Sequence, residues 1–137
     1  MIRIRCVHDG GLFIFRLDDT TGNLELIQEL EVSSNGEDAG AEILVGPSGQ
    51  FVYASSRGTG VVVVYKLEMD DTLVRVEEYS LGGTWPRSMA IRDNLMVVID
   101  QYGDSVQVLT IDQDTGKLKG GDLYTTPSQP SFVDFME

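Results

Sequence analysis

A short pattern of alternating residues occurs three times in this chain, and it limits the folds that the chain can adopt. It reads "FIFRLD" at 13–18, "VVYKLE" at 63–68 and "QVLTID" at 107–112, so the copies start 50 and 44 residues apart. Each copy is followed by a turn and a leucine, in "TTGNL", "MDDTL" and "DTGKL". A period of about 40 to 50 residues with several short strands is typical of a β-propeller blade. A β-sandwich also has many short strands, but it gives no reason for the repeat.

About twelve short runs rich in β-branched and aromatic residues alternate with turn sequences, and helical spacing is almost absent. The sequence therefore predicts an all-β fold, a partial β-propeller of about three four-stranded antiparallel blades, in one domain over 1–137. One blade is expected at 41–80, with strands at 41–46, 50–56, 61–68 and 73–80. The next is expected at 86–125, with strands at 86–92, 94–100, 105–112 and 117–125. Residues 1–32 supply part of an earlier blade, and "SFVDFME" supplies a final inner strand at 131–136.

Three blades are too few for a closed ring, since propellers have about four to eight. An open arc leaves two apolar blade faces in water, where they favour association or aggregation. The chain is therefore expected to be the C-terminal part of a longer protein or a protomer that self-associates to close its ring. A six-bladed dimer is one such assembly.

The alternation of strand direction places the unusual polar residues on one rim of the arc. Glu42 and Arg87 open inner strands, Arg57 follows a second strand, and Gln101 and Tyr102 take the matching place in the next blade. Ordinary hairpin turns such as "GPSG", "MDDT" and "DQDTG" fall on the opposite rim. We expect the charged ends of Glu42, Arg57 and Arg87 to lie within about 10 Å of a common point, roughly one Debye length at 0.1 M salt.

The stretch "GAEILVGPSGQFVYASSRGTGVVVVYKLE", followed by "GGTWPRSMAI", resembles the lactonase-like seven-bladed propellers. That family includes bacterial 6-phosphogluconolactonases and fungal carboxy-cis,cis-muconate cyclases. The resemblance covers roughly 38–137 and implies a segment related to metal-independent hydrolysis of 6-phosphogluconolactone-type lactones, or to muconate cyclisation. A histidine that the family places on its earlier blades has no counterpart here, because His8 lies in a turn outside the matching motif.

Lactone opening needs a base that activates water and a cation that stabilises the oxyanion. Glu42 with Arg57 and Arg87 offers this set as candidate catalytic residues, and arginines also bind carboxylate or phosphate through two hydrogen bonds. Candidate substrate-binding residues are Gln101, Tyr102 and Trp85, the last as an aromatic that stacks on a sugar. The resemblance implies no cofactor and no metal site. The "DQDTGK" stretch lacks the glutamate that closes a calcium loop, and it is interpreted as a turn.

Two other interpretations remain open from the residues alone. Glu42 and Arg57 are also explained as a structural ion pair that ties the loops of one blade together. The whole segment is also explained as a non-catalytic truncated propeller that acts as a binding or interaction module. Whether the chain is an enzyme is left open. On an open arc the charged groups would face bulk water, which weakens their interaction with an oxyanion, so the isolated arc is expected to show little lactonase activity.

The net charge narrows the choice of partner. With 22 acidic and 10 basic residues, the chain carries −12 at pH 7, which disfavours nucleic acid and membrane surfaces. The expected partner is a small-molecule lactone or organic acid, bound where arginines reverse the field locally. A single cysteine, Cys6, excludes an internal disulfide and favours a reducing compartment. The predicted localisation is cytoplasmic.

Overall fold

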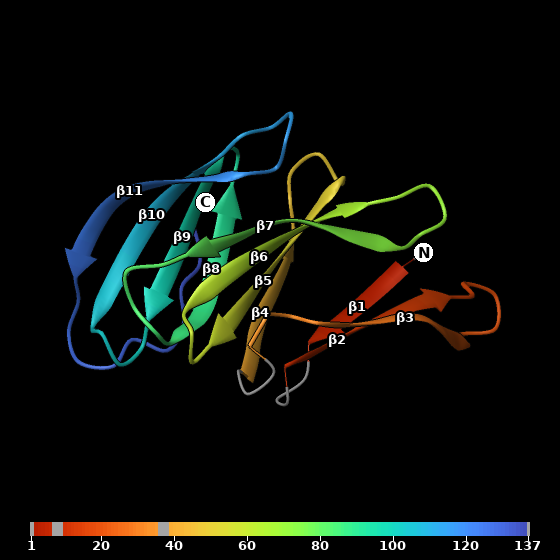
Figure 1. Ribbon diagram of the computed structural model, residues 1–137, viewed down its shortest axis with the longest axis horizontal. Coiled ribbons are helices and arrows are strands. Elements are labelled where there is room, and N and C mark those ends of the chain that lie inside the picture. The colour runs from red at the N-terminus through yellow and green to blue at the C-terminus, as the bar shows by residue number, and fades with distance from the viewer. Residues whose placement is uncertain (1, 7–9, 36–38, 137) are drawn as a thin grey trace.

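The computed structural model describes residues 2–6, 10–35 and 39–136, and in these ranges the chain forms strands and turns and no helix. Three antiparallel sheets follow one another along the chain and lie side by side (Figure 1). The first sheet contains β1 (Ile2–Cys6), β2 (Gly11–Leu17) and β3 (Leu24–Glu31). The second contains β4 (Ala39–Val45), β5 (Phe51–Arg57), β6 (Val61–Leu67) and β7 (Leu73–Ser80). The third contains β8 (Pro86–Arg92), β9 (Leu95–Asp100), β10 (Ser105–Ile111) and β11 (Leu118–Thr125).

Within each sheet the strands pair in the order of the sequence, as they do in a propeller blade. The predicted fold class is confirmed: two complete four-stranded blades follow a three-stranded part of an earlier one. In the described part of the chain, no helix has the length and apolarity that crossing a membrane requires.

The sheets pack face to face, and the second sheet is buried on both of its faces. On β5, Phe51 and Tyr53 contribute to a core shared with the third sheet, whereas Val52 and Ala54 contribute to a core shared with the first. The run "VVVV" on β6 divides in the same way between the two cores. A strand with two buried faces needs apolar residues at every position, which explains why this run shows no alternation. Burial of apolar area on both sides is the main term that stabilises the stack.

A turn of the third sheet fits closely against the second sheet. Tyr53 donates a hydrogen bond of 2.7 Å from its hydroxyl to the carbonyl oxygen of Gly116. Gly116 has a φ of +74°, and the ring of Phe51 occupies the space that a Cβ at this position would need. Glycine is therefore required in the "DTG" turn for its backbone conformation and for this close approach.

Burial raises the pKa of the Tyr53 hydroxyl to about 12, and the nearby Glu77 and Asp112 carboxylates add to the effect. The folded protein therefore holds this proton up to about pH 12, whereas an unfolded tyrosine releases it near pH 10. Stability is accordingly expected to be complete below about pH 10 and to fall between pH 10 and 12. Tyr53→Phe is expected to remove this contribution and to cost about 1 kcal/mol at neutral pH through the lost hydrogen bond.

Urea denaturation at several pH values between 7 and about 11.5 measures both effects, since the free energy of unfolding is obtained at each pH. Tyr102→Phe is the matched control, because the Tyr102 side chain is 60% exposed. An unchanged alkaline loss of stability in Tyr53→Phe would show that another group causes it.

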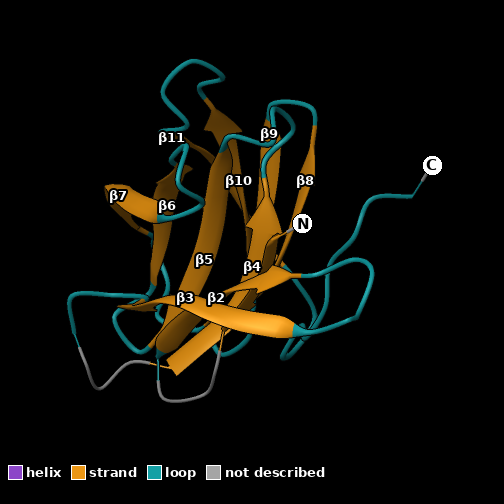
Figure 2. Ribbon diagram, turned by 90° about the vertical axis from the view of Figure 1, so that its right-hand side faces the viewer, coloured by secondary structure: helices purple, strands orange, loops and turns teal. Residues whose placement is uncertain are grey.

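The predicted final strand at 131–136 is not formed. This segment runs as an extended stretch without ladder pairing, and the backbone N–H of Val133 donates to the Ser88 hydroxyl of β8 over 3.4 Å. An inner strand needs the second strand of its own blade as a partner. The strand with a free edge that could pair with it is β1. This strand belongs to the first sheet, which lies at the opposite end of the arc from the third (Figures 1 and 2). The segment therefore takes the place of an inner strand beside β8 but has no strand to pair with.

Candidate functional site

The inner strands of the two complete blades, β4 and β8, each have a register shift near their first residues. The register of β4 with β5 shifts between Gly40 and Ile43, and that of β8 with β9 shifts between Pro86 and Ser88. Such bulges bend a strand locally and redirect its side chains, and they are frequent next to functional sites. Glu42 lies within the first irregularity, where its backbone N–H donates to the Ser55 hydroxyl over 3.0 Å. Arg87 lies within the second.

Arg57 ends β5, and its contacts include one with β4 and one with Trp85. Its Nη2 donates to the carbonyl oxygen of Gly40 over 2.9 Å, and its guanidinium carbon lies 5.5 Å from the ring centre of Trp85. Trp85 in turn packs against Tyr102, with the ring centres 5.0 Å apart and the planes inclined by 36°. A guanidinium over an aromatic face is attracted by the ring quadrupole. Arg57, Trp85 and Tyr102 thus form one stack that joins the second blade to the third.

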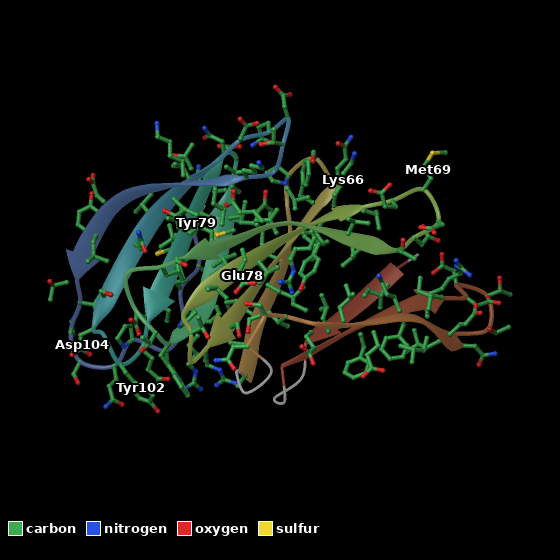
Figure 3. The ribbon with its side chains drawn as sticks, viewed as in Figure 1. Lys66, Met69, Glu78, Tyr79, Tyr102 and Asp104 are labelled. Carbon is green, nitrogen blue, oxygen red and sulfur yellow. The ribbon has the colours of Figure 1, made fainter. Side chains whose placement is uncertain are left out.

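Arg87 and Glu42 lie on the two inner strands. The Nη1 of Arg87 donates to Oε1 of Gln101 over 3.0 Å, and the backbone N–H of Gln101 donates to the carbonyl of Trp85 over 3.1 Å. Glu42 accepts a long hydrogen bond of 3.4 Å from the Ser88 hydroxyl. Figure 3 shows Tyr102 near one end of the strands and Met69 near the other. The ion pairs of the described residues do not include one between Glu42 and Arg57, and Glu42 contacts Ser88 of the neighbouring blade.

Six residues predicted from the sequence are thus linked in two groups. One group joins Arg57, Trp85, Tyr102, Gln101 and Arg87 through stacking and hydrogen bonds, and the other joins Glu42 to β8. That the three charged ends meet at a common point stays a prediction. His8 lies outside the described residues. Among the residues that are described, no three His, Cys, Asp or Glu side chains gather as metal ligands would.

Asp100, at the end of β9, has a structural role that was not predicted from the sequence. Its side chain is buried, with the residue 9% exposed, and it accepts hydrogen bonds of 3.1 Å from the backbone N–H groups of Thr84 and Gly103. Gly83 and Gly103 approach the carboxylate so closely that a Cβ on either would overlap it. Asp100 therefore fixes the loop before Trp85 to the loop after Tyr102. The glycines of "LGGTW" and "QYGD" are the signal in the sequence that could have indicated such a close approach.

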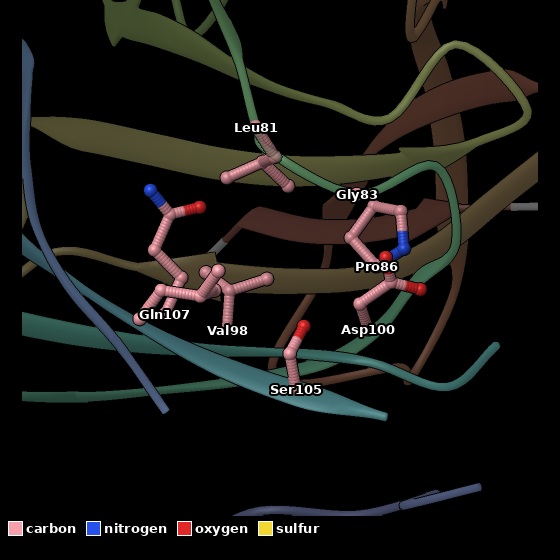
Figure 4. A pocket seen from close by; sticks show the side chains of 8 residues that line it. Leu81, Gly83, Pro86, Val98, Asp100, Ser105 and Gln107 are labelled. Carbon is pink, nitrogen blue, oxygen red and sulfur yellow. The ribbon is translucent and has the colours of Figure 1, made fainter. Parts of the chain in front are cut away.

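A small cavity of about 10 Å³ lies beside Asp100 at the junction of the blades, which is about the space that one water needs. Figure 4 shows its polar lining by Asp100, Ser105 and Gln107, with Val98 and Leu81 nearby. The volume is far too small for a sugar or an organic acid. The cavity belongs to the packing below the rim and is not itself a substrate site.

The acidic turns on the opposite rim are local structures. Asp112 accepts hydrogen bonds of 2.9 and 3.0 Å from the backbone N–H groups of Asp114 and Thr115, and Asp18 bonds Thr20 and Thr21 in the same way. These N–H groups lower the pKa of the Asp112 and Asp18 carboxyls. The carboxylates thus serve as turn-forming groups, which confirms the interpretation of "DQDTGK" as a turn.

The sheets and the rim together define a class: a partial β-propeller with arginines and aromatic residues gathered where two blades meet. Residues 9–135 match the sequence pattern of the protein family described as "Lactonase, 7-bladed beta-propeller". The chain belongs to this lactonase family.

Curated relatives of the chain are described as 6-phosphogluconolactonases. It is 28% identical to a 6-phosphogluconolactonase of Serratia proteamaculans and 25% identical to one of Pectobacterium carotovorum. Each alignment covers 96% of this chain and 42% of the relative, so the chain spans about two-fifths of the length of these relatives.

Solved structures show the same fold. A candidate 6-phosphogluconolactonase from Bacteroides fragilis superposes with a TM-score of 0.85 at 26% identity, over 94% of this chain and 36% of that one. A protein from Lactobacillus plantarum superposes with a TM-score of 0.88 at 22% identity, over 94% and 39% of the two chains.

Proposed function

We propose that the rim of this chain carries part of a lactone-hydrolase site, with a sugar-acid lactone that bears a carboxylate or phosphate as its substrate class. The observation that supports this most strongly is the stack of Arg57 on Trp85 and Tyr102, with Arg87 beside it. One guanidinium lies over an aromatic surface, and a second is linked to it through Gln101, on a chain of net charge −12. A local positive site of this kind is what an anionic sugar derivative requires. The 6-phosphogluconolactonase relatives support the same substrate class.

The chemistry of the proposal assigns one task to each group. Glu42 accepts a proton from a water molecule, whose oxygen attacks the lactone carbonyl carbon. Arg57 stabilises the negative charge that develops on the carbonyl oxygen, and Arg87 binds the substrate carboxylate or phosphate. The bond between the carbonyl carbon and the ring oxygen then breaks, and the ring oxygen takes up the proton that Glu42 had accepted, which gives the hydroxy acid and restores the carboxylate.

The solvent exposure of these three side chains determines how strongly they stabilise an oxyanion. Arg87 is exposed, and Glu42 and Arg57 are partly exposed. In bulk water their interaction with an oxyanion is several-fold weaker than in a closed, drier channel. We expect the isolated arc to bind an anionic sugar acid and to turn over little lactone, whereas an assembly with a closed ring turns it over.

The role of Glu42 is tested in such an assembly. Glu42→Gln is expected to lower kcat for 6-phosphogluconolactone by roughly 10²–10⁴-fold, because the base is lost while the shape of the side chain is kept. Glu68→Gln removes the same charge on the opposite rim and is expected to leave kcat unchanged. Proton release at constant pH follows the hydrolysis. Equal turnover in Glu42→Gln and the unmodified chain would contradict the assignment.

The alternative of a binding module without catalysis is separated by the same assay. It predicts saturable binding of the acid and turnover no faster than the spontaneous reaction in every assembly state. Muconate cyclisation differs in its readout, since a cyclase forms the lactone from the dicarboxylate and the absorbance of the conjugated acid is lost.

A further inference from the structure

A side-chain contact between outer strands repeats from blade to blade. The N–H of Leu73, the first residue of β7, donates to Oε1 of Gln28 on β3 over 2.7 Å. The N–H of Leu118, the first residue of β11, donates to Oε1 of Glu77 on β7 over 3.2 Å. Gln28 and Glu77 are each the fifth residue of their strand, next to a register shift that occurs at the same place in both sheets. Each blade thus binds the start of the outer strand in the following blade.

The two end sheets carry the two halves of this contact without a neighbouring blade to complete it. The fifth residue of β11 is Asp122, an exposed carboxylate on the last sheet whose Oδ2 also accepts a hydrogen bond from the Tyr124 hydroxyl over 3.2 Å. The first residue of β3 is Leu24, at the matching place on the first sheet. The last sheet thus offers the acceptor, and the first sheet offers the position that receives it.

The apolar contact between blades shows the same complementarity. Phe51, 4% exposed, fills the space over Gly116 in the turn of the next blade. Gly22 occupies the same position in the turn of the first sheet, with a φ of +76°, yet no described residue beyond its chain neighbours lies within 4 Å of the space over it. The counterpart of Phe51 in the last blade is Leu95, which begins β9 and is 42% exposed. The open space over Gly22 on the first sheet thus corresponds to the partly exposed Leu95 side chain on the last sheet.

The segment 131–136 provides a third match. It follows Pro130, and the inner strand β8 begins with Pro86; the connections that precede these two prolines are similarly short, 126–129 and 81–85. Val133 and Phe135 are partly buried, whereas Phe132, Asp134 and Met136 are exposed, which is the two-residue period of a strand. β1, at the edge of the first sheet, is the strand beside which an inner strand would pair.

We propose that two copies of this chain associate head to tail, with the last sheet of each packed on the first sheet of the other. Leu95 of one copy covers Gly22 of its partner, Asp122 binds the N–H of Leu24, and 131–136 adds to the edge of β1. Two such contacts, related by a twofold axis along the channel, close a six-bladed ring. Six blades lie within the range that propellers adopt, and closure removes the open edges and faces.

The test measures the mass of the full chain by light scattering between about 1 and 100 µM. The proposal predicts a particle of two chains. A single chain throughout this range would overturn it, and so would a particle that keeps growing with concentration.

Three variants locate the contact surface. Leu95→Asp on the last sheet and Leu26→Asp on the first place a carboxylate on 42% and 50% exposed apolar positions, so each chain is expected to fold. Each is expected to weaken the association about 100-fold or more, because the carboxylate would be buried without a partner. Met69→Asp makes the same change at a fully exposed outer turn and is expected to leave the pair intact. Circular dichroism confirms that each variant folds.

Mixing the two weakened variants distinguishes a head-to-tail contact from any other. A Leu95→Asp chain keeps an intact first sheet, and a Leu26→Asp chain keeps an intact last sheet. Their mixture is therefore expected to form pairs through the one unaltered contact, although neither variant pairs alone. A mixture that stays monomeric, or a Leu95→Asp chain that still pairs, would overturn the proposed surface.

Discussion

Gly83→Ala is expected to destabilise the protein by about 3 kcal/mol, although Gly83 has no unusual backbone angle that would demand glycine. The added methyl group would overlap the carboxylate of Asp100. That carboxylate is buried and accepts the N–H groups of Thr84 and Gly103, so displacing it leaves a buried charge and two backbone donors without partners. The loop that carries Trp85 would lose its anchor at the same time.

The neighbouring glycine provides a matched control. Nothing lies within 4 Å of the position that a Cβ on Gly82 would take, so Gly82→Ala is expected to change stability by less than about 0.5 kcal/mol. Denaturant unfolding measures both variants. The emission of Trp85, the single tryptophan, reports the environment of the rim and is expected to shift to longer wavelength in Gly83→Ala alone. Equal stability of the two variants would show that Asp100 does not hold this junction.

Arg57→Ala is expected to weaken the binding of a phosphorylated sugar acid roughly 10- to 100-fold. A charge-assisted hydrogen bond to a ligand is worth about 1.5–3 kcal/mol, and the variant also removes the cation that lies over Trp85. Arg57→Lys keeps the charge but loses the planar group that stacks and binds through two donors, so it is expected to recover only part of the affinity. Isothermal titration calorimetry with 6-phosphogluconate measures these differences.

Arg16→Ala is the control for charge. Arg16 lies on the first sheet, paired with Glu25 and Asp71 near the outer turns, so its removal lowers the net charge without touching the rim. It is expected to change the affinity less than about twofold, since exposed pairs are screened by salt. Comparable losses in Arg16→Ala and Arg57→Ala would indicate a general charge effect instead of a binding site.

The strand positions could be predicted because each blade repeats the same local pattern. The run at 63–68 and its relatives at 13–18 and 107–112 are each followed by a turn whose Asp, Thr or Gly residues fix the hairpin, as the Asp112 turn shows. These are local interactions, and the repeat makes each copy support the others. The segment 131–136 has the same local pattern but no strand, because an inner strand depends on a partner from its own blade.

The contacts at the rim were harder to predict because they depend on distant segments. The irregular register of β4 at Glu42 cannot be recognised in "AEILV", and it turns this residue toward Ser88 instead of Arg57. Asp100 has the appearance of an ordinary strand end, and its role depends on glycines in loops on both sides of β8 and β9. The sequence therefore indicated which polar residues lie on the rim, but it did not indicate which of them contact one another.

The rim formed by Arg57, Trp85 and Arg87 is proposed to bind an anionic sugar acid. Titration of the chain with 6-phosphogluconate, followed by the emission of Trp85, tests it most directly because no other tryptophan contributes. A saturable change in emission is expected for the unmodified chain and a much weaker one for Arg87→Ala, which leaves the stack on Trp85 in place. No change in emission up to about 10 mM ligand, or the same titration curve for Arg87→Ala, would contradict it.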